Sequence, residues 1–541
     1  MATEEQNPKG ISRREFLKGA AVGAGAVATT TLIASCSPKV ATPAPTDQPA
    51  SGVQGQASFM TPPDPIAQAD IKETISADVV VVGAGVSGLM AALSAAEAGA
   101  KTILVEKSES FNARGGHNAA LRSKIQLEEG LDYQPGQVAR ELVRWSSNKA
   151  DSRLVMLWAD NCSPTMDYLI DMADKAGIEV LRWGNDVPNA YYPEYKTVHM
   201  FGAMDQTILA GMLETAGKEK GVDFHYSTPA AQLVREDKGR VTGVIAKNAD
   251  GDYVQFNGSK AVILATGDYG HNEEMIQRYC PKAAIVDMNV YAPAVNTGDG
   301  HMMGMWIGAA MQDDEPHTPM VHNLGGAPFS GDPFLRVNAL GLRYENEDVP
   351  IPYMANSIQM QPDHKTWTIY DSTFADDLPK MGTSFSRVTA MSDSTQTSMD
   401  TALKDGKSLF QADTLDELAQ KMGVPVDAFK ATVSRYNELA KKGSDDDFGK
   451  DPEMMTLIDT APFYAAYNPL ALLVVLGGLK VNTNLQVLDT EGQVIPGLYA
   501  SGNASGGMFS NDYPVIVPGL SHSRAWTFGR IAGQNAAAEN A

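Results

Sequence analysis

The sequence predicts an α/β protein whose first domain is assembled from discontinuous segments, with an α+β domain inserted between them. The segment Asp78–Lys107 runs from a valine-rich stretch through a glycine-rich turn and a helical stretch to a second apolar stretch. This is the order of a β-α-β unit with parallel strands. An apolar stretch ending in Ala-Thr-Gly follows at residues 260–275, and another strand and turn come at residues 494–507. Pieces of one sheet that lie so far apart imply an inserted second domain.

The glycine-rich turn has the spacing of a dinucleotide-binding fold. Gly83 permits the tight turn after the strand, Gly85 lets the backbone approach a pyrophosphate, and Gly88 lets helix and strand pack closely. The N-terminus of the helix then faces the negative phosphates. Glu106 ends the second strand 18 residues after Gly88, where its carboxylate can accept hydrogen bonds from ribose hydroxyls. The ordered set of strand, turn, helix and acid therefore predicts a Rossmann-like domain that binds a dinucleotide.

Length and charge restrict the other possibilities. A chain of 541 residues is too long for one simple core, so two packed domains and a targeting segment are expected. The formal charge of −22 argues against nucleic acid as a partner, because neutralising phosphates requires basic patches. An acidic surface instead keeps an exported protein soluble.

Residues 1–36 read as a targeting segment. Arg13 and Arg14 precede a weakly apolar run that is too short and too rich in Gly, Ala and Thr to span a membrane. The segment resembles a twin-arginine export signal, and the residues before Cys36 resemble a bacterial lipobox. The alternative is a signal peptide cut elsewhere, with an incidental cysteine. Residues 37–72 are rich in Pro, Ala, Gln and Thr, which predicts a flexible linker. We expect an exported protein at the cell surface or periplasmic face, lipid-anchored to the cytoplasmic membrane.

The mature chain keeps Cys162 and Cys280. They could pair in an oxidising compartment, but two buried thiols are favoured. The sequence has no C-x-x-C, so it carries no c-type haem or iron–sulfur cluster of its own. No regular set of metal ligands is present either, so no metal is expected. Electrons must therefore come from a separate donor.

Several further motifs extend the pattern along the chain. They are ARGGHNAA at 113–120, VILATGDYG at 262–270, NTGDG at 296–300, VNALGLRYENE at 337–347, LGGLKVNTN at 476–484, and IPGLYASGNASGG followed by TFGRIAG at 527–533. With them, residues 77–538 resemble the flavoprotein family of fumarate reductase and succinate dehydrogenase, together with its 3-ketosteroid dehydrogenase relatives. The resemblance implies an FAD-binding domain at 73–311 and 456–541, and a capping or substrate domain at 312–455.

The resemblance implies FAD as the cofactor. Some relatives tether FAD through a histidine just upstream of the ARGG-like segment; here that stretch is KSESFN, and His117 stands elsewhere, so noncovalent FAD is expected. The residues expected to bind FAD are Gly83, Ala84, Gly85, Ser87, Gly88, Glu106, Lys107, Gly115, Gly116, His117, Asn118, Ala265, Thr266, Gly267, Asp299, Gly502, Asn503, Gly519, Leu520 and Ser521. The backbone of the last two, at the start of the final helix, would stabilise the anionic reduced flavin.

The resemblance also suggests catalytic residues. Arg343 falls on the family's proton-donating arginine, although an arginine alone is a poor acid. The upstream relay residues of relatives are replaced by GGAPFSGDP, where Asp332 is the only ionisable group. The alternative for Arg343 is an ion pair with Glu345 or Glu347. His317 lies near the family's substrate histidine; the alternative is an ion-paired loop residue.

Two groups that hold a dicarboxylate in fumarate reductases are missing. Leu473 or Val474 stands in place of a histidine, and Tyr513 stands in place of an arginine. Burying a dicarboxylate without partners costs several kcal/mol. Fumarate is therefore an improbable substrate.

Tyr513 has a possible role of its own. Steroid dehydrogenases have Tyr-Pro-Gly-x-Gly in this region; Tyr513-Pro514 matches its start, but the glycine comes late, at Gly519. A phenol in a dry, apolar pocket can donate a hydrogen bond to a carbonyl or a proton to an enolate. The alternative is a tyrosine that only packs in the core. Arg524, on the last helix, is expected to be an ordinary helix charge.

Together these features predict an exported FAD-dependent reductase that transfers a hydride from flavin N5 to the activated C=C bond of an apolar or aromatic enone or enoate. Its expected setting is anaerobic respiration, with a separate membrane quinol or cytochrome-type electron donor. One alternative is a 3-ketosteroid dehydrogenase-like enzyme that introduces a C=C bond next to a ketone. Another is a noncatalytic flavin-binding carrier.

Overall fold

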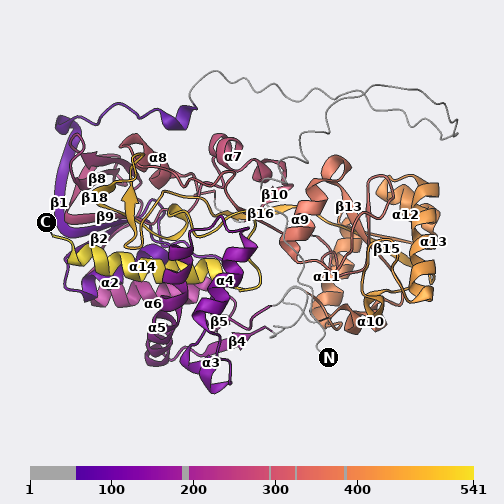
Figure 1. Cartoon of the computed structure of the whole chain (residues 1–541). Coiled ribbons are helices and arrows are strands. Elements are labelled where there is room, and N and C mark those ends of the chain that lie inside the picture. The colour runs from indigo at the N-terminus through magenta and orange to yellow at the C-terminus, as the bar shows by residue number, and fades with distance from the viewer. Residues whose placement is uncertain (1–56, 185–193, 291–293, 323–325, 383–386, 541) are drawn as a thin grey trace, which may run out of the picture. The chain divides into compact units, whose positions relative to one another are not determined.

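The computed structural model describes residues 57–184, 194–290, 294–322, 326–382 and 387–540 (Figure 1). The predicted signal, Cys36 and most of the predicted linker lie outside the described residues. The chain divides into residues 1–55 and a compact unit of residues 56–541, and the description below concerns the second. None of the helices in the described ranges combines the length and apolarity needed to cross a membrane.

The largest sheet is mostly parallel and confirms the predicted α/β fold. Its order is β17-β18-β9-β1-β2-β6, with β8 and β7 continuing from β9. The strands are β1 (Ile71–Val82), β2 (Thr102–Val105), β6 (Asp223–His225), β7 (Ala230–Arg235), β8 (Val241–Lys247), β9 (Tyr253–Leu264), β17 (Gln486–Leu488) and β18 (Val494–Ala500). β18 pairs in parallel with β9, which itself pairs in parallel with β1. The sheet is thus assembled from distant segments, as predicted.

Helices cover this sheet and explain its valine-rich strand. Val79, Val80 and Val81 are fully buried, as expected for a parallel strand covered on both faces. The helices of this part are α2 (Val86–Glu97), α3 (Lys124–Glu128), α4 (Pro135–Trp145), α5 (Ser152–Ala176), α6 (Gln206–Glu219), α7 (Glu273–Tyr279), α8 (Asp299–Trp306) and α14 (Leu520–Ala538). In Figure 1, α14 lies alongside α2, and α6 also packs against α2. A Cβ at Gly533 would approach the Ala91 carbonyl oxygen to 2.2 Å, so glycine is required where α14 crosses α2.

A second sheet is antiparallel and has four strands in the described part of the chain. Its order is β12-β13-β15-β14, with helices around it. The elements are β12 (Leu335–Asn338), α9 (Ile351–Gln359), β13 (Thr366–Asp371), α10 (Phe374–Asp377), α11 (Asp393–Asp405), β14 (Leu409–Ala412), α12 (Leu415–Met422), α13 (Val426–Lys442) and β15 (Phe463–Tyr467). The predicted boundary at residue 455 precedes β15, which completes this sheet. The domain boundaries otherwise stay a prediction.

Two small sheets bring further segments to the main domain. One has the order β10-β16-β11 and the other β3-β5-β4. Their strands are β3 (Asn118–Ala119), β4 (Val180–Trp183), β5 (Val198–Phe201), β10 (Met288–Asn289), β11 (Pro319–His322) and β16 (Ala471–Val475). β11 runs antiparallel to β16, with Met320 opposite Val474. Segments about 150 residues apart in the chain therefore meet beside the cavity described below.

Both cysteines of the described chain are free, buried thiols. This confirms the favoured interpretation over a disulfide. Burial raises the pKa of Cys162 and of Cys280 to about 12, so both remain protonated and unreactive at neutral pH.

Candidate active site

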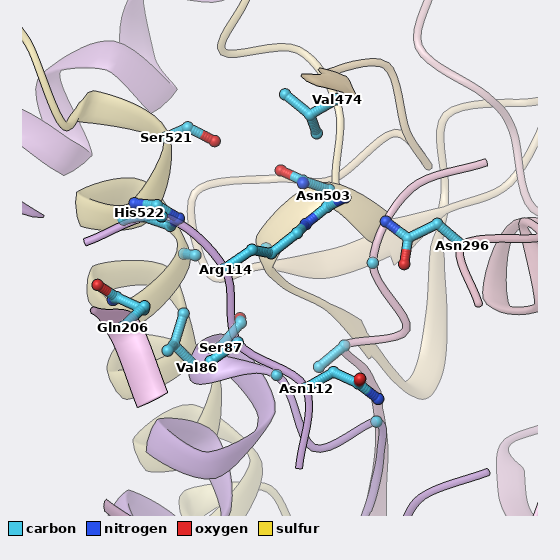
Figure 2. Close-up of a pocket in the computed structure, with 18 of the residues that line it drawn as sticks. Val86, Ser87, Asn112, Arg114, Gln206, Asn296, Val474, Asn503, Ser521 and His522 are labelled. Atoms are coloured by element: carbon cyan, nitrogen blue, oxygen red, sulfur yellow. The ribbon is translucent and has the colours of Figure 1, made fainter. Parts of the chain in front are cut away.

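A cavity of about 430 Å³ opens at the carboxyl edge of the parallel sheet. Its walls are the turns that follow β1, β9 and β18 and the residues at the start of α2 and α14 (Figure 2). Ligands of open α/β sheets bind outside the carboxyl ends of the strands, because the turns and helix N-termini converge there. The cavity is therefore the candidate ligand site.

The glycine-rich turn leaves room for a ligand backbone. A Cβ at Gly83 would lie 2.5 Å from the Ala265 carbonyl oxygen, and the φ of Gly83 is +107°, so only glycine fits this turn. A Cβ at Gly88 would lie 1.9 Å from the Gly83 carbonyl oxygen. At Gly85, in contrast, the nearest described atom to a Cβ is the Asn112 oxygen at 3.8 Å. Gly85 thus faces open space, as a close pyrophosphate requires.

The acid after β2 is organised by backbone donors. The carboxylate of Glu106 accepts hydrogen bonds from the Ala84 N–H at 2.7 Å and from the Ser108 N–H at 2.8 Å. Each of its oxygens keeps a second lone pair, and the residue lines the cavity. Beside it, the Lys107 ammonium pairs with Asp299 at 2.8 Å. This arrangement fits recognition of ribose hydroxyls.

Most of the predicted FAD residues line the cavity. They are Gly83, Gly85, Ser87, Glu106, Lys107, Gly115, Gly116, His117, Ala265, Thr266, Gly267, Asp299, Gly502, Asn503, Gly519 and Ser521. Four predicted residues stand behind its wall. Ala84 donates to Glu106, Gly88 packs against Gly83, and Leu520 is buried in the core. Asn118 is fully buried and exchanges hydrogen bonds with Gln206.

The other end of the cavity is apolar around one phenol. Its apolar walls include Met320, Leu473, Val474 and Val515. Tyr513 lines the same cavity and is 3% exposed, and its hydroxyl oxygen accepts a hydrogen bond from the Ser521 N–H at 3.0 Å. Figure 2 shows Val474 and Ser521 at one side of the cavity and Ser87 at the other. The phenol of Tyr513 therefore lies apart from the glycine-rich turn that follows β1.

A family profile described as an FAD binding domain matches residues 78–514, most of the chain. The chain belongs to this family of FAD-binding flavoproteins. It is 31% identical over 491 residues to the vinyl phenol reductase of Lactiplantibacillus plantarum (strain ATCC BAA-793 / NCIMB 8826 / WCFS1), a match covering 85% of this chain and 96% of the relative. The predicted FAD cofactor and oxidoreductase class are thus confirmed.

Two solved structures share the fold. One is the open conformation of a flavocytochrome c3 fumarate reductase, with 27% identity and a TM-score of 0.66 over 87% of this chain and 79% of that chain. The other is a 3-ketosteroid-Δ4-(5α)-dehydrogenase from Rhodococcus jostii RHA1 in complex with 4-androstene-3,17-dione. Its identity is 23% and its TM-score 0.68 over 87% of this chain and 99% of that chain. A twin-arginine signal profile matches residues 10–30, which confirms the predicted export signal.

Arg343, which the family resemblance placed at the proton-donor position, does not lie among the residues that line the cavity. Its guanidinium forms paired hydrogen bonds with Glu347, at 2.8 and 2.9 Å, and with Asp445, at 3.0 and 2.8 Å. Burial lowers the pKa of Arg343, but the hydrogen bonds and charges of Glu347 and Asp445 raise it by more. The net shift of its pKa is therefore upward. The ion-pair alternative, with Glu347, describes this geometry, and the guanidinium is held away from any substrate in the cavity.

His317 does not lie among the cavity-lining residues either. Its Nδ1 lies 2.5 Å from the Tyr269 hydroxyl, and its ring stacks on Tyr279 with centroids 5.0 Å apart. Burial lowers the pKa of His317 to about 3, so the ring is neutral. His317 is therefore a core residue. Neither the predicted substrate contact nor the alternative, an ion-paired loop residue, describes this position.

His322 lines the cavity beside the apolar wall, in addition to His117 and His522. It ends β11, and it is 5% exposed with an Nε2 that has no hydrogen-bond partner in the described structure. Burial lowers its pKa to about 4, so it is neutral at pH 7. Met320 and His322 are two residues apart on one strand, so their side chains point to the same face, and both line the cavity. This alternation is the signal by which the sequence could have placed His322 in the site.

The cavity also has residues that sequence reasoning missed. They are Val82, Val86, Val105, Asn112, Ala113, Arg114, Met204, Gln206, Ala230, Val295, Asn296, Met320, Pro518, His522 and Ala525. Arg114 is the notable one, because Figure 2 shows it beside Asn503 in the middle of the site. Its guanidinium pairs with the buried carboxylate of Asp268 at 2.9 Å. Both wall cations, Lys107 and Arg114, are therefore already matched with carboxylates.

Proposed function

We propose that this protein is an exported FAD-dependent reductase that saturates the activated C=C bond of an apolar or aromatic enone or enoate. The observation that carries the proposal is that Tyr513 and an apolar wall line the same cavity as the residues expected to bind FAD. A planar conjugated acceptor gains from burial against Leu473, Val474 and Met320. A small dianion gains nothing there, because the wall cations are matched with carboxylates.

When bound, FAD supplies two electrons as a hydride from its reduced ring. The chain supplies the proton and the polarisation. The Ser521 N–H donates to the Tyr513 oxygen and so holds the phenol at the wall of the cavity, where its O–H is the proposed donor to a ligand. Tyr513 first donates a hydrogen bond to the acceptor group conjugated with the C=C bond, where negative charge develops.

In the proton step, the O–H bond of Tyr513 breaks and a C–H bond forms at the carbon next to the one that receives hydride. The substrate is reduced by two electrons, and Tyr513 is left as a phenolate that solvent reprotonates. His322, neutral and facing the cavity, provides a second polar contact that orients the acceptor. The apolar side chains exclude water from the reacting carbons.

The comparisons support an aromatic acceptor. The similar vinyl phenol reductase is named for a substrate in which an aromatic ring is conjugated with a C=C bond. Such a molecule presents one polar group and a flat apolar body, which matches the phenol of Tyr513, the imidazole of His322 and the hydrophobic wall. We therefore place aryl-conjugated alkenes, enoates and enones in the proposed class and exclude fumarate from it.

The cellular setting is part of the proposal. Export through the twin-arginine route, followed by lipid attachment at Cys36, would place the enzyme at the outer face of the cytoplasmic membrane. A membrane quinol or cytochrome-type donor would reduce it there, and the acceptor would serve anaerobic respiration. Mass spectrometry of the membrane-bound protein tests the anchor: a lipid on Cys36 supports it, and an unmodified soluble mature form contradicts it.

Flavin reoxidation tests the reaction. The purified flavoprotein is reduced with dithionite without oxygen, and cinnamate-type enoates, aryl enones or fumarate are added while flavin absorbance is followed. Recovery of the oxidised spectrum with aryl substrates but not with fumarate supports the proposal. Recovery with fumarate alone contradicts it.

A second candidate is a ketosteroid dehydrogenase-like reaction in the opposite direction. The Tyr513-Pro514 pair favours it, because it matches the start of the steroid dehydrogenase motif. Saturated ketones would then bleach the oxidised flavin, whereas the reductase proposal predicts no bleaching. The same instrument and the same protein sample decide between the two.

A further inference from the structure

Arg524 is a buried cation without a carboxylate partner. Its side chain is fully buried in α14, and within the described part of the chain no Asp or Glu forms a salt bridge with it. The sequence had suggested an ordinary helix charge, which would be exposed. Burial lowers the pKa of Arg524 to about 9, which leaves it cationic at neutral pH. A charge kept in the core at this cost needs a compensating interaction.

The neutral contacts of Arg524 satisfy only part of its hydrogen-bonding capacity. It donates to the Gly502 carbonyl at 2.5 Å, to the Ser505 carbonyl at 2.9 Å and to Asn503 Oδ1 at 2.6 Å. Its Nε has no hydrogen-bond partner in the described structure. These bonds fix the turn that follows β18, but dipoles alone do not balance a full positive charge.

The aromatic residues beside Arg524 connect it with the catalytic phenol. The Arg524 Cζ lies 5.1 Å from the centre of the Phe509 ring, and the Phe509 ring centre lies 5.8 Å from that of Tyr513. All three side chains are at most 3% exposed. Ser521, whose N–H binds the Tyr513 oxygen, is three residues before Arg524 and so lies on the same face of α14.

We infer that Arg524 is a positioning residue for the proton step: its buried charge stabilises the Tyr513 phenolate left when the proton has moved to substrate. This inference rests on the proposed function. The cation and the Ser521 N–H at the helix N-terminus both favour a negative Tyr513 oxygen, and water does not screen them. The negative charge that compensates the buried Arg524 is thus the phenolate, which forms during turnover.

The other charged groups near Tyr513 are engaged elsewhere. Asp512 binds Asn356 at 2.9 Å and approaches Lys282 at 4.0 Å. His522 binds the His117 carbonyl at 2.9 Å, and burial lowers its pKa, so it is neutral. His322, across the cavity, is also neutral at pH 7. Among these described groups, Arg524 is the one that keeps its charge at neutral pH and interacts electrostatically with Tyr513.

The test follows Tyr513 directly. Ultraviolet difference titration of the FAD-loaded protein, wild type minus Tyr513→Phe, isolates the phenolate band of Tyr513. We expect Arg524→Gln to raise the midpoint of this band by about one pH unit or more. Flavin reoxidation by an aryl enone should slow by about tenfold for each unit if the proton step limits it. Arg524→Lys should restore most of the shift, because it keeps the charge.

A control variant on the same helix separates the explanations. Arg530→Gln, on the same helix with its guanidinium 3.8 Å from the Tyr168 ring, should change neither quantity. The inference fails if Arg524→Gln leaves the titration unchanged while flavin stays bound, if Arg524→Lys behaves like Arg524→Gln, or if Tyr513 does not titrate before the wild type unfolds. Full activity of Tyr513→Phe would refute the proposed function instead, and the titration would still report on Arg524.

Discussion

The backbone N–H of Ser521 donates a hydrogen bond to the hydroxyl oxygen of Tyr513 at 3.0 Å. The donor belongs to the first turn of α14, where the N–H groups have no partner within the helix. The bond fixes the phenol at the cavity wall and takes one of its lone pairs. The hydroxyl oxygen is thereby held at the wall of the cavity that Tyr513 lines.

Tyr513→Phe should slow reoxidation of the reduced flavin by an aryl enone by about 10²–10⁴-fold, because it removes the proton and keeps the ring. The flavin spectrum and FAD content should stay unchanged. Tyr499→Phe is the matched control, since Tyr499 is also buried and its hydroxyl binds Glu539 away from the cavity. Stopped-flow absorbance measures both variants, and wild-type rates in Tyr513→Phe would mean that the tyrosine only packs.

His322→Leu should raise KM for an aryl enoate more than it lowers kcat, because the ring orients substrate and does not supply the proton. His322→Asn, which keeps a polar side chain, should recover part of the affinity. Steady-state kinetics with a dithionite-reduced viologen as donor gives both constants. An unchanged KM in His322→Leu would show that the unpartnered Nε2 does not meet the substrate.

Gly85→Ala should weaken FAD binding without destabilising the apoprotein, because the added Cβ meets no described protein atom within 3.4 Å and would instead occupy the pyrophosphate space. Flavin content after purification and thermal unfolding of the apoprotein test this. Gly136→Ala, in α4 with open space around the added Cβ, should change neither. Gly88→Ala should destabilise the apoprotein itself, since its Cβ would lie 1.9 Å from the Gly83 oxygen. Equal losses of stability in Gly85→Ala and Gly88→Ala would contradict this division.

Asp445→Asn should destabilise the folded protein by about 3–5 kcal/mol at pH 7, because it leaves the buried Arg343 with one carboxylate fewer. Burial acts to raise the pKa of Asp445, but hydrogen bonds from Arg343 and the Lys450 N–H lower it to about 2. The stability from Asp445 is thus present above its unfolded pKa of 3.8 and is lost as pH falls toward 2.

Urea unfolding between pH 7 and pH 2 measures this contribution. The variant should lose stability less steeply than the wild type below about pH 4. Asp416→Asn, which breaks the exposed pair with Lys430, should cost less than about 1 kcal/mol. Parallel stability curves for the wild type and Asp445→Asn would show that Asp445 has an ordinary pKa.

The parts of the site that the sequence predicted are those that local chemistry determines. Gly83, Gly85 and Glu106 are required by one turn and one strand end, so their roles can be read from spacing. Leu473 and Val474, one of which the resemblance put in place of a histidine, both line the cavity. The main sheet was predictable for the same reason, because buried valine runs and glycine turns are local signals.

The residues whose surroundings the sequence did not show depend on partners far away in the chain. Arg343 was placed by resemblance, but its position follows from Asp445, about a hundred residues later, which no local motif announces. His322 reaches the cavity because β11 pairs with β16. Arg524 is buried because the turn after β18 folds over it. Such pairings are set by tertiary structure and cannot be read from spacing alone.

The most direct test of the central claim is a crystal structure of the FAD-loaded protein with a saturated aryl ketone that cannot be reduced further. The account predicts the aryl group against Leu473, Val474 and Met320, with the ketone oxygen about 2.6–3.0 Å from the Tyr513 hydroxyl. A ligand bound away from Tyr513, or one whose polar group is held by arginine side chains, would contradict it.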